Sequence, residues 1–549
     1  MSEYQHQTLI NQVTEGRSDP KPEKSSLTVT NKMKAVFIIA ILLSLLAANF
    51  IFLSGFALGF SITILVTEIL IFAILPVPVS RRTLVFCIFL ALSVVALGAT
   101  YTIFSDYILG AINFLAIIFL LLFQLLLYSQ SLSFDWDSPE FIFELFLSPV
   151  TRPFVALPSL FRVGKAFVPM KPENIDTASS SSLSSSSPSR KSIGLKILLG
   201  VLLALPVMII AIFLLSSADL VFRSIFVNIA DFLSSISVNE IFTTIIIAAF
   251  IFPFLFSMMF SYYTKWKNKT LSPEYLFTAG RGLSIDSIIA ATFLFCVNIL
   301  YAIFAYVQFT SLFFSFQLIL PENVTFAEYA RQGFFQLSAI TFINLLIIIV
   351  SLILTKRKGF AGLFVRVLSV TLIFFTFVQL ASAAYRMKMY IDAYSLSKLR
   401  FFVSIFMGLI AILLIFALFK EFFTKFKFLK AGVIVSIVIL LFTNYISTDA
   451  LIAQYNTSRY FDKNIKLDTE YLLDGLSNEA IVHVIPLMDD DDSLLAESVK
   501  HDILSIYAYS LSDYDNGDWR RYSFSKENAK KAIEKYFGST LEKELEPFR

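Results

Sequence analysis

Long apolar runs separated by short polar segments make up most of the chain, and this alternation predicts its elements. Each run is about twenty residues long, the length that an α-helix needs to cross the hydrocarbon core of a bilayer. The first run, 35–53, has no small-residue cleavage site after its end, so we expect a retained helix and not a signal peptide. The predicted spans are residues 35–53, 56–75, 84–103, 108–128, 195–216, 240–262, 284–306, 338–355, 363–384, 401–419 and 431–447. The sequence therefore predicts an all-α, polytopic integral membrane protein with about eleven transmembrane helices.

Polar stretches interrupt this pattern and divide the chain. Residues 1–34 predict a disordered cytoplasmic tail, and residues 129–194 predict a cytoplasmic amphipathic segment followed by a Ser-rich linker. Residues 217–239 are too polar to span and are expected at the interface or as a re-entrant helix. Residues 448–549 predict a small, acidic α-helical domain, whose first helix, 449–456, is expected to continue the last span. Transmembrane helices 1–4 then occupy residues 35–128, and helices 5–11 occupy residues 195–447.

The basic residues test this topology, because short cytoplasmic loops of membrane proteins are enriched in Lys and Arg. With a cytoplasmic N-terminus, the loops on that side carry bases that include Arg81, Arg82, Lys356, Arg357, Lys358, Lys420, Lys425, Lys427 and Lys430. The opposite loops are poor in bases, with one exception that carries Arg386, Lys388, Lys398 and Arg400. We therefore expect a multi-pass protein of the cell membrane with an extracytoplasmic C-terminal domain. The exceptional loop is the weak point of this topology.

Composition agrees with a membrane environment and separates two charged regions. The chain is 57% apolar and 15% charged, whereas about a quarter of the residues in soluble domains are charged. The net charge of +3 hides about 20 acids against about 12 bases from Asp449 to Arg549, so the rest of the chain carries about +11. No basic patch for nucleic acid is present. The expected partners are the lipid bilayer and a protein bound by the C-terminal domain.

Signatures of common enzyme classes are missing from the sequence. It contains no Gly-x-x-x-x-Gly-Lys-Ser/Thr, Gly-x-Gly-x-x-Gly, His-Glu-x-x-His or Gly-x-Ser-x-Gly motif. Cys87 and Cys296 lie in apolar runs and do not resemble a metal or redox pair. We therefore expect no catalytic, cofactor-binding or metal-ligating residues, and the sequence favours a non-enzymatic protein.

Glu68 stands out because it lies near the middle of the second predicted span. A carboxylate at that depth costs a few kcal/mol unless it is protonated, paired or hydrated. One hypothesis is that Glu68 couples proton or ion movement. The other is that it forms a structural hydrogen bond to a neighbouring helix, as we expect for intramembrane amides such as Asn113, Gln124 and Asn444.

Two stretches on the predicted external side also combine charged and aromatic residues. Glu328 and Arg331 precede the eighth predicted span, whereas Arg386, Asp392 and Arg400 follow the ninth. We expect an acid of these stretches to pair with one of the arginines. If the ninth helix extends beyond the lipid, its tyrosines belong to the interfacial aromatic belt.

The stretch Glu328–Leu337, EYARQGFFQL, resembles the YAR-x-GFF-x-L signature of a bacterial family of multi-pass membrane proteins, the domains of unknown function DUF4153 and DUF4173. Asp449–Asn456, Leu467–Leu472 and Trp519–Ser523 are similar to other parts of that family in the same order. The resemblance covers about residues 195–525. It implies family membership and no particular activity.

Three functional hypotheses follow. The first is a non-enzymatic sensory, assembly or envelope-related protein in which the acidic C-terminal domain binds a partner. The second is a secondary transporter or channel that uses Glu68 and the segment 217–239. The third is a membrane-embedded transferase, which would bring external acids together with two arginines in an interfacial cavity. The acids are Glu322, Glu328 and Asp392, and the arginines are Arg331 and Arg386.

Overall fold

The computed structural model describes residues 29–74, 80–129, 140–167, 240–264, 285–308, 326–355, 357, 359–463, 467–512, 514 and 517–548. The regular elements in these ranges are helices, accompanied by one isolated bridge between Ile285 and Thr355. Nine helices among the described residues are long and apolar enough to cross a membrane, and a shorter apolar helix covers Leu58–Ala73. They correspond to ten of the predicted spans, whereas residues 195–239 lie outside the described ranges. The prediction of an all-α, polytopic membrane protein is confirmed.

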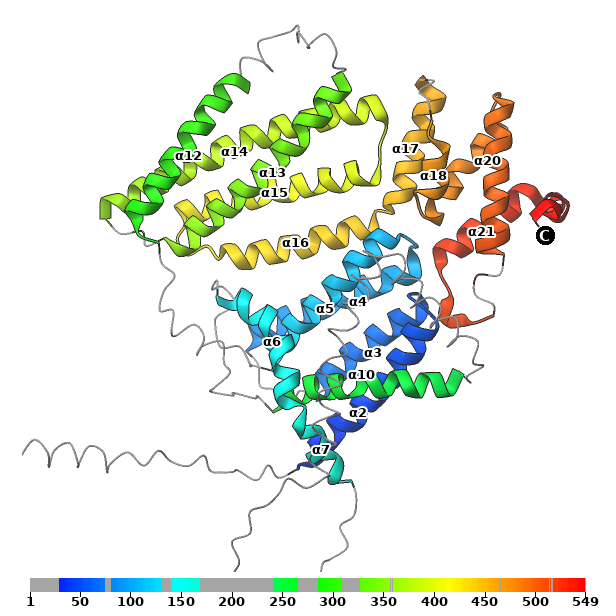
Figure 1. The fold of residues 1–549 in the computed structure, drawn as a ribbon, viewed down its shortest axis with the longest axis horizontal. Helices are drawn as coiled ribbons and strands as arrows, with labels where there is room; N and C mark the ends of the chain where they lie inside the picture. Colours follow the sequence, from blue (N-terminus) through cyan, green and yellow to red (C-terminus); the bar gives the residue numbers. More distant parts are fainter. Residues whose placement is uncertain are drawn as a thin grey trace, which may run out of the picture.

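The first bundle is formed by helices from the N-terminal part of the chain together with α10 (Figure 1). Its elements are α2 (Asn31–Ala47), the π-helical turn η1 (Ala48–Leu53), α3 (Leu58–Ile74), α4 (Arg81–Ile103), α5 (Tyr107–Tyr128), α6 (Glu140–Ala156), α7 (Pro158–Lys165) and α10 (Glu240–Tyr263). Buried Phe60, Leu97 and Phe123 belong to its main core. Gly98 lets α3 and α4 approach closely, because a Cβ at this position would lie 3.0 Å from Ile64.

The second bundle lies beside the first and contains the remaining long helices (Figure 1). These are α12 (Ser287–Gln308), α13 (Phe326–Leu354), α14 (Gly359–Tyr394), α15 (Lys398–Phe422) and α16 (Phe428–Tyr445). Buried amides join its helices as the sequence predicted. Asn344 donates to Gln379 Oε1 at 2.9 Å and accepts from the Tyr301 hydroxyl at 2.7 Å. These contacts connect α12, α13 and α14.

Helix α14 is longer than a bilayer requires. Its 36 residues extend about 54 Å at 1.5 Å per residue, whereas the hydrocarbon core is about 30 Å thick. The helix is therefore long enough to extend beyond the lipid. Tyr390 and Tyr394 lie in its last turns, with ring centroids 5.3 Å apart.

Helix α16 connects the two bundles. Phe428, at its start, packs into the second core, whereas Ile437 packs into the first. Near its end, Asn444 and Asn113 of α5 exchange hydrogen bonds of 3.0 and 2.5 Å. The Tyr445 hydroxyl then donates to the carbonyl of Ala96 in α4 at 2.8 Å. The bundles are thus joined by polar contacts inside the membrane region.

The residues after α16 form a helical C-terminal domain with a core of its own. Its elements are α17 (Thr448–Lys463), α18 (Thr469–Asp474), η3 (Asn478–Ala480), α19 (Ile481–Val484), η4 (Ile485–Asp489), α20 (Ser493–Ile506), η5 (Tyr507–Leu511), η6 (Trp519–Arg521), α21 (Phe524–Phe537), η7 (Gly538–Thr540), α22 (Leu541–Glu544) and η8 (Glu546–Phe548). Ile452, Leu487 and Ile533 are buried in that core. The expected continuation of the last span into 449–456 is wrong. Ser447 adopts φ 54° between α16 and α17, so the chain turns there instead.

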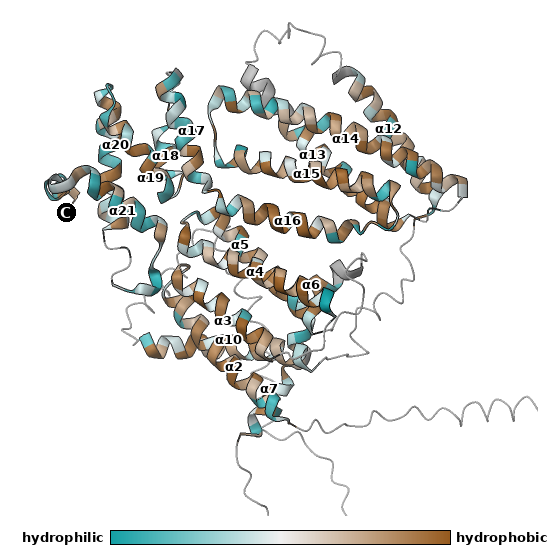
Figure 2. Ribbon diagram, turned by 180° about the vertical axis from the view of Figure 1, so that it is seen from behind, coloured by the Kyte–Doolittle hydropathy of each residue, from teal (hydrophilic) through white to brown (hydrophobic). Residues whose placement is uncertain are grey.

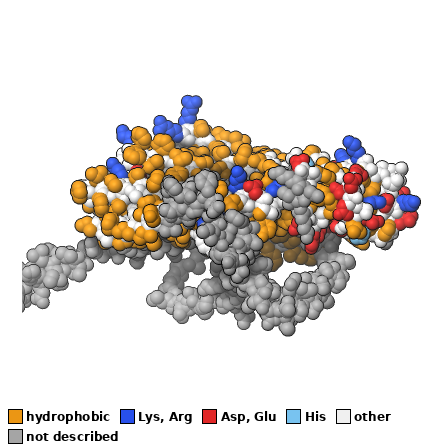
Figure 3. Space-filling view, turned by 90° about the horizontal axis from the view of Figure 1, so that it is seen from above, with side chains coloured by type: hydrophobic (Ala, Val, Ile, Leu, Met, Phe, Trp, Pro, Cys, Tyr) orange, Lys and Arg blue, Asp and Glu red, His pale blue; other side chains and the backbone are white. Residues whose placement is uncertain are grey.

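Surface composition separates the membrane region from the domain. Apolar residues predominate along the helices of both bundles, whereas polar residues are frequent in α17, α20 and α21 (Figure 2). In the space-filling view, Asp and Glu gather over the C-terminal domain at the right of the picture (Figure 3). The domain therefore lies at one end of the bundles, where the turns after α4 and α14 also lie.

Candidate functional site

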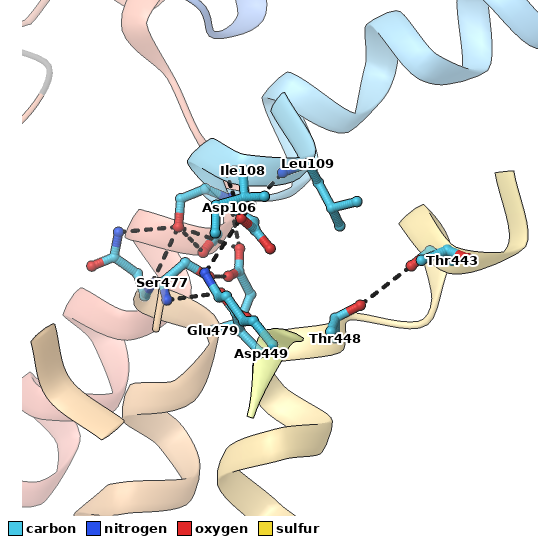
Figure 4. Close-up of polar contacts among 12 residues, drawn as sticks. Asp106, Ile108, Leu109, Thr443, Thr448, Asp449, Ser477 and Glu479 are labelled. Atoms are coloured by element: carbon cyan, nitrogen blue, oxygen red, sulfur yellow. Dashed lines mark hydrogen bonds and ion pairs between the residues drawn. The ribbon is translucent and has the colours of Figure 1, made fainter. Parts of the chain in front are cut away.

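A buried cluster of ion pairs and hydrogen bonds lies where the C-terminal domain meets both bundles. We call it the junction and define it as Ser105, Asp106, Lys398, Asp449, Ser477, Asn478 and Glu479. Figure 4 shows the acidic members converging on the turn between α4 and α5. The junction thus contains residues of the first bundle, the second bundle and the domain.

Asp106 and Lys398 both lie where a helix begins, Asp106 before α5 and Lys398 in α15. Asp106 is the N-cap of α5 and accepts from the backbone N–H groups of Ile108 and Leu109 at 2.9 and 3.3 Å. Lys398 is the first residue of α15, where the partial positive charge of a helix N-terminus disfavours a cation. It therefore requires acidic neighbours.

Lys398 obtains two such neighbours. Its Nζ lies 2.9 Å from Asp449 Oδ2 and 3.3 Å from Asp106 Oδ1. The side chains of Lys398 and Asp106 are each 6% exposed and that of Asp449 is 1% exposed. Burial raises the pKa of Asp449, as does the nearby charge of Asp106, whereas hydrogen bonds from Ser477 and Lys398 lower it. The pairing compensates the desolvation of the lysine only while both carboxylates stay in place.

Glu479 attaches the domain to the α4–α5 turn. Its Oε1 accepts from the backbone N–H of Ser105 at 2.6 Å, and its Oε2 accepts from the Ser477 hydroxyl. The Ser105 hydroxyl also accepts from the backbone N–H of Asn478 at 3.2 Å and contacts the hydroxyl of Ser525 in α21 at 3.1 Å. Burial raises the pKa of Glu479. The turn is therefore held by several hydrogen bonds from the domain.

The chemistry of the junction is that of a structural ion and hydrogen-bond network. Its lysine bridges carboxylates from two separate parts of the chain. Within the described ranges, no group of three or more His, Cys, Asp or Glu residues is arranged to hold a metal ion. Asp106 Oδ2 and Asp449 Oδ1 are buried without a hydrogen-bond partner in the described residues, so each carboxylate retains one free acceptor.

The junction lies within a region of the chain that matches a known family. A family model described as a domain of unknown function (DUF4153) matches residues 86–487. The chain belongs to the DUF4153 family. The match begins earlier than the resemblance seen in the sequence and ends before α21. It contains every residue that defines the junction. No curated protein and no solved structure matches the chain.

In this DUF4153 protein, Glu68 lies apart from the junction, inside the first bundle. It is 3% exposed, and its Oε2 accepts from Gln124 Nε2 at 2.7 Å. The core around it includes Cys87, Phe72 and Tyr128. Glu68 Oε1 and Gln124 Oε1 have no hydrogen-bond partner in the described residues. The pair joins α3 to α5.

The remaining candidate residues fall on α13, α14 and α15. Glu328 and Arg331 lie in the first turns of α13, and their side chains are outside the described set. Arg386 is 6% exposed within α14. The Asp392 carbonyl accepts from Arg459 of α17 at 2.8 Å, so this part of α14 contacts the C-terminal domain.

Arg400 binds backbone and aromatic groups at the turn between α14 and α15. Its guanidinium donates to the carbonyls of Tyr394 and Ser395 and lies 4.1 Å from the ring centroid of Tyr390. Lys398 is paired in the junction. Two of the four bases of the exceptional loop, Lys398 and Arg400, are therefore held by specific partners.

Sequence reasoning did not identify Asp106, Lys398 and Asp449 as a site. The available signal was Lys398 itself, a lysine in a loop where few bases were expected. Its partners are distant in sequence, since Asp106 lies 292 positions away. No local pattern connects them.

Proposed function

We propose that this chain is a non-enzymatic membrane protein of sensory or assembly role, in which the C-terminal domain controls how the two transmembrane bundles lie against each other. The observation that carries this proposal is the position of Lys398, an α15 residue buried between Asp106 of the first bundle and Asp449 of the domain. A partner that displaces the domain would break a contact that both bundles share. Binding outside the bundles is thereby coupled to their arrangement.

The outer surface of the domain supports a protein partner. Leu494 and Tyr509 are 79% and 76% exposed, and Asp491 and Asp492 are exposed close to Leu494. Large exposed apolar side chains beside acids suit a protein with apolar and basic contact residues. The partner in this proposal therefore binds α20 and the acidic turn before it.

The proposal includes the orientation of the chain in the cell membrane, with a cytoplasmic N-terminus and an extracytoplasmic domain. Arg81, Arg357 and Lys427 lie at the helix ends opposite the junction, as expected for cytoplasmic loops. Glu240, at the start of α10, pairs with Arg520 of the domain at 2.8 Å. A reporter fused after Arg549 that is active only outside the cytoplasm should be active, and a cytoplasmic signal would refute this orientation.

Hydrogen–deuterium exchange of the full chain in lipid nanodiscs tests the role of the junction. Lys398→Met should accelerate exchange at the backbone amides of Ser105, Ser477 and Asn478, which donate to junction side chains. The matched control is Lys500→Met, because the Lys500–Glu544 pair of 2.8 Å is 36% exposed on both sides. If the three amides exchange as slowly in Lys398→Met as in the wild type, the junction does not hold the domain and the proposal fails.

A further inference from the structure

A cavity of about 460 Å³ lies beside the junction, between the first bundle and the C-terminal domain. Its lining joins the start of α3, the α4–α5 turn and the start of α21. These bundle segments are helix ends, so the cavity lies where the apolar spans meet the polar domain. A cavity at the ends of apolar spans, next to a polar domain, suits molecules that have both an apolar and a polar part.

The bundle side of the cavity is aromatic. Phe56, Tyr107 and Phe114 line it and are 52%, 71% and 37% exposed. Phe56 and Phe114 also contact each other, with ring centroids 5.6 Å apart. Exposed rings at the ends of transmembrane helices suit acyl chains and the glycerol region of lipids.

The domain side of the cavity is basic. Arg521 and Lys526 both line it, and the Arg521 side chain is 42% exposed, with its Nε 3.8 Å from Asp518. Lys526 Nζ lies 5.5 Å from the ring centroid of Tyr514. Within the described residues Lys526 forms no ion pair. Burial lowers the pKa of Lys526, and the nearby charge of Arg521 lowers it further. An anion placed between the two side chains would relieve this repulsion.

Ser523 gives the cavity a buried hydroxyl that lacks a partner. It is 5% exposed, lines the cavity, and its Oγ forms no hydrogen bond within the described part of the chain. Ser523 is also the N-cap of α21, yet its side chain does not cap the 14-residue helix. A hydroxyl, two cations and a helix N-terminus together form a site for a phosphate group.

The carboxylate of Asp106 indicates a second feature of the ligand, a hydroxyl group. Its Oδ1 is bound to Lys398, whereas Oδ2 is buried without a hydrogen-bond partner in the described residues, and the residue lines the cavity. Arg521 is paired with Asp518, whereas Lys526 has no ion pair within the described residues, so an anionic group of the ligand fits beside these two bases. Asp106 Oδ2 can accept a hydrogen bond from a hydroxyl group on the same ligand.

We propose that this cavity binds the headgroup of an anionic glycerophospholipid that carries hydroxyl groups, such as a phosphoglycerol lipid. Its phosphodiester lies against Arg521, Lys526 and Ser523, and a headgroup hydroxyl donates to Asp106. Its acyl chains leave over Phe56 and Phe114 towards the bilayer. A lipid in this position fills the space between the first bundle and the domain.

Native mass spectrometry of the purified full chain tests this site, with dioleoyl phosphatidylglycerol as the probe. One equivalent should bind, and Arg521→Ala/Lys526→Ala should lower the affinity about tenfold or more. Ser523→Ala, which removes only a hydroxyl, should lower it several-fold and serves as a second variant that does not remove a charge. Lys531→Ala is the matched control, because Lys531 is a 68% exposed base on the outer surface of α21.

The comparison of ligands separates the sources of the phosphate. Free glycerol 3-phosphate and dioleoyl phosphatidylethanolamine should bind at least tenfold more weakly than dioleoyl phosphatidylglycerol. Equal binding of glycerol 3-phosphate would overturn a lipid site, and equal binding of the zwitterionic lipid would overturn the preference for a net anionic headgroup. An equal loss in Lys531→Ala, or unchanged binding in both cavity variants, would also overturn the proposal.

Discussion

At the scale of single residues, the charge of Lys398 stands out because it is buried at the N-terminus of a helix. Neither burial nor the helix dipole favours an ammonium group there. Asp106 and Asp449 compensate both effects through contacts of 3.3 and 2.9 Å. The stability of the docked domain should therefore depend on this one side chain more than on any surface charge.

Replacing Lys398 tests the free energy of that contact. Lys398→Met leaves two buried carboxylates without their cation and should destabilise the folded chain by about 3–5 kcal/mol. Lys500→Met removes a partly exposed ion pair and should change stability by at most about 1 kcal/mol. Thermal unfolding in detergent measures both values, and equal shifts of Tm would contradict the buried role of Lys398.

A substitution of Glu68 distinguishes a role in helix packing from a role in transport. Glu68→Gln can form an amide–amide pair with Gln124 that also uses Gln124 Oε1, which has no partner in the described residues. We expect this variant to fold and to keep the cellular phenotype of the wild type. A folded Glu68→Gln protein without function would instead support proton or ion coupling through Glu68.

At the scale of elements, the turn between α16 and α17 determines where the domain lies. Ser447 has φ 54° in this turn, and Ser395 has φ 65° in the turn before α15. Both turns precede a helix that carries a junction residue, Asp449 or Lys398. The left-handed conformation of a non-glycine residue costs about 1 kcal/mol, which the contacts of the domain offset.

Substitution at Ser447 tests this turn. Ser447→Gly should raise the free energy of unfolding by about 0.5–1 kcal/mol, because glycine adopts the left-handed conformation without strain. Ser447→Val should lower it by 1 kcal/mol or more, since a β-branched residue disfavours positive φ. Denaturation of both variants measures the difference, and a Val variant as stable as the Gly variant would show that the turn is not left-handed.

The buried acids of the junction give docking a pH dependence. Burial raises the pKa values of Asp449 and Glu479 above their ordinary range near 4. The docked state thus binds protons more tightly than the released state, so this contribution to stability is present below pH 4 and is lost as pH rises through the raised values.

Docking should therefore weaken as pH rises from about 4 through the raised pKa values of Asp449 and Glu479, and Glu479→Gln should make this dependence smaller. The protection factor of the Ser477 backbone amide across this range measures how tightly the domain is docked. Docking that strengthens as pH rises would contradict the direction given by burial.

At the scale of the whole molecule, the sequence predicted the membrane architecture and not the junction. Each apolar run is a local feature of the sequence, and each must be long enough by itself to cross the hydrocarbon core of the bilayer. Ten spans could therefore be recognised. Asp106, Lys398 and Asp449 come together only through packing of both bundles. Glu68 was visible because of its depth, yet the structure places it in a helix-to-helix hydrogen bond.

In the proposed function, docking of the C-terminal domain fixes the relative position of the two bundles. Double electron–electron resonance can measure this with spin labels at positions 82 and 425, at the ends of the bundles opposite the junction. Arg82 and Lys425 are exposed and belong to different bundles. Cys296 is exposed and would be replaced by Ser, whereas Cys87 is buried.

The wild type and Lys500→Met should give the same narrow distance distribution between these labels. Lys398→Met should give a shifted or broadened one, because the contact shared by both bundles is lost. If Lys398→Met releases the amides of Ser105 and Ser477 in hydrogen exchange and yet leaves the distance distribution unchanged, the domain does not control the bundles and the account is contradicted.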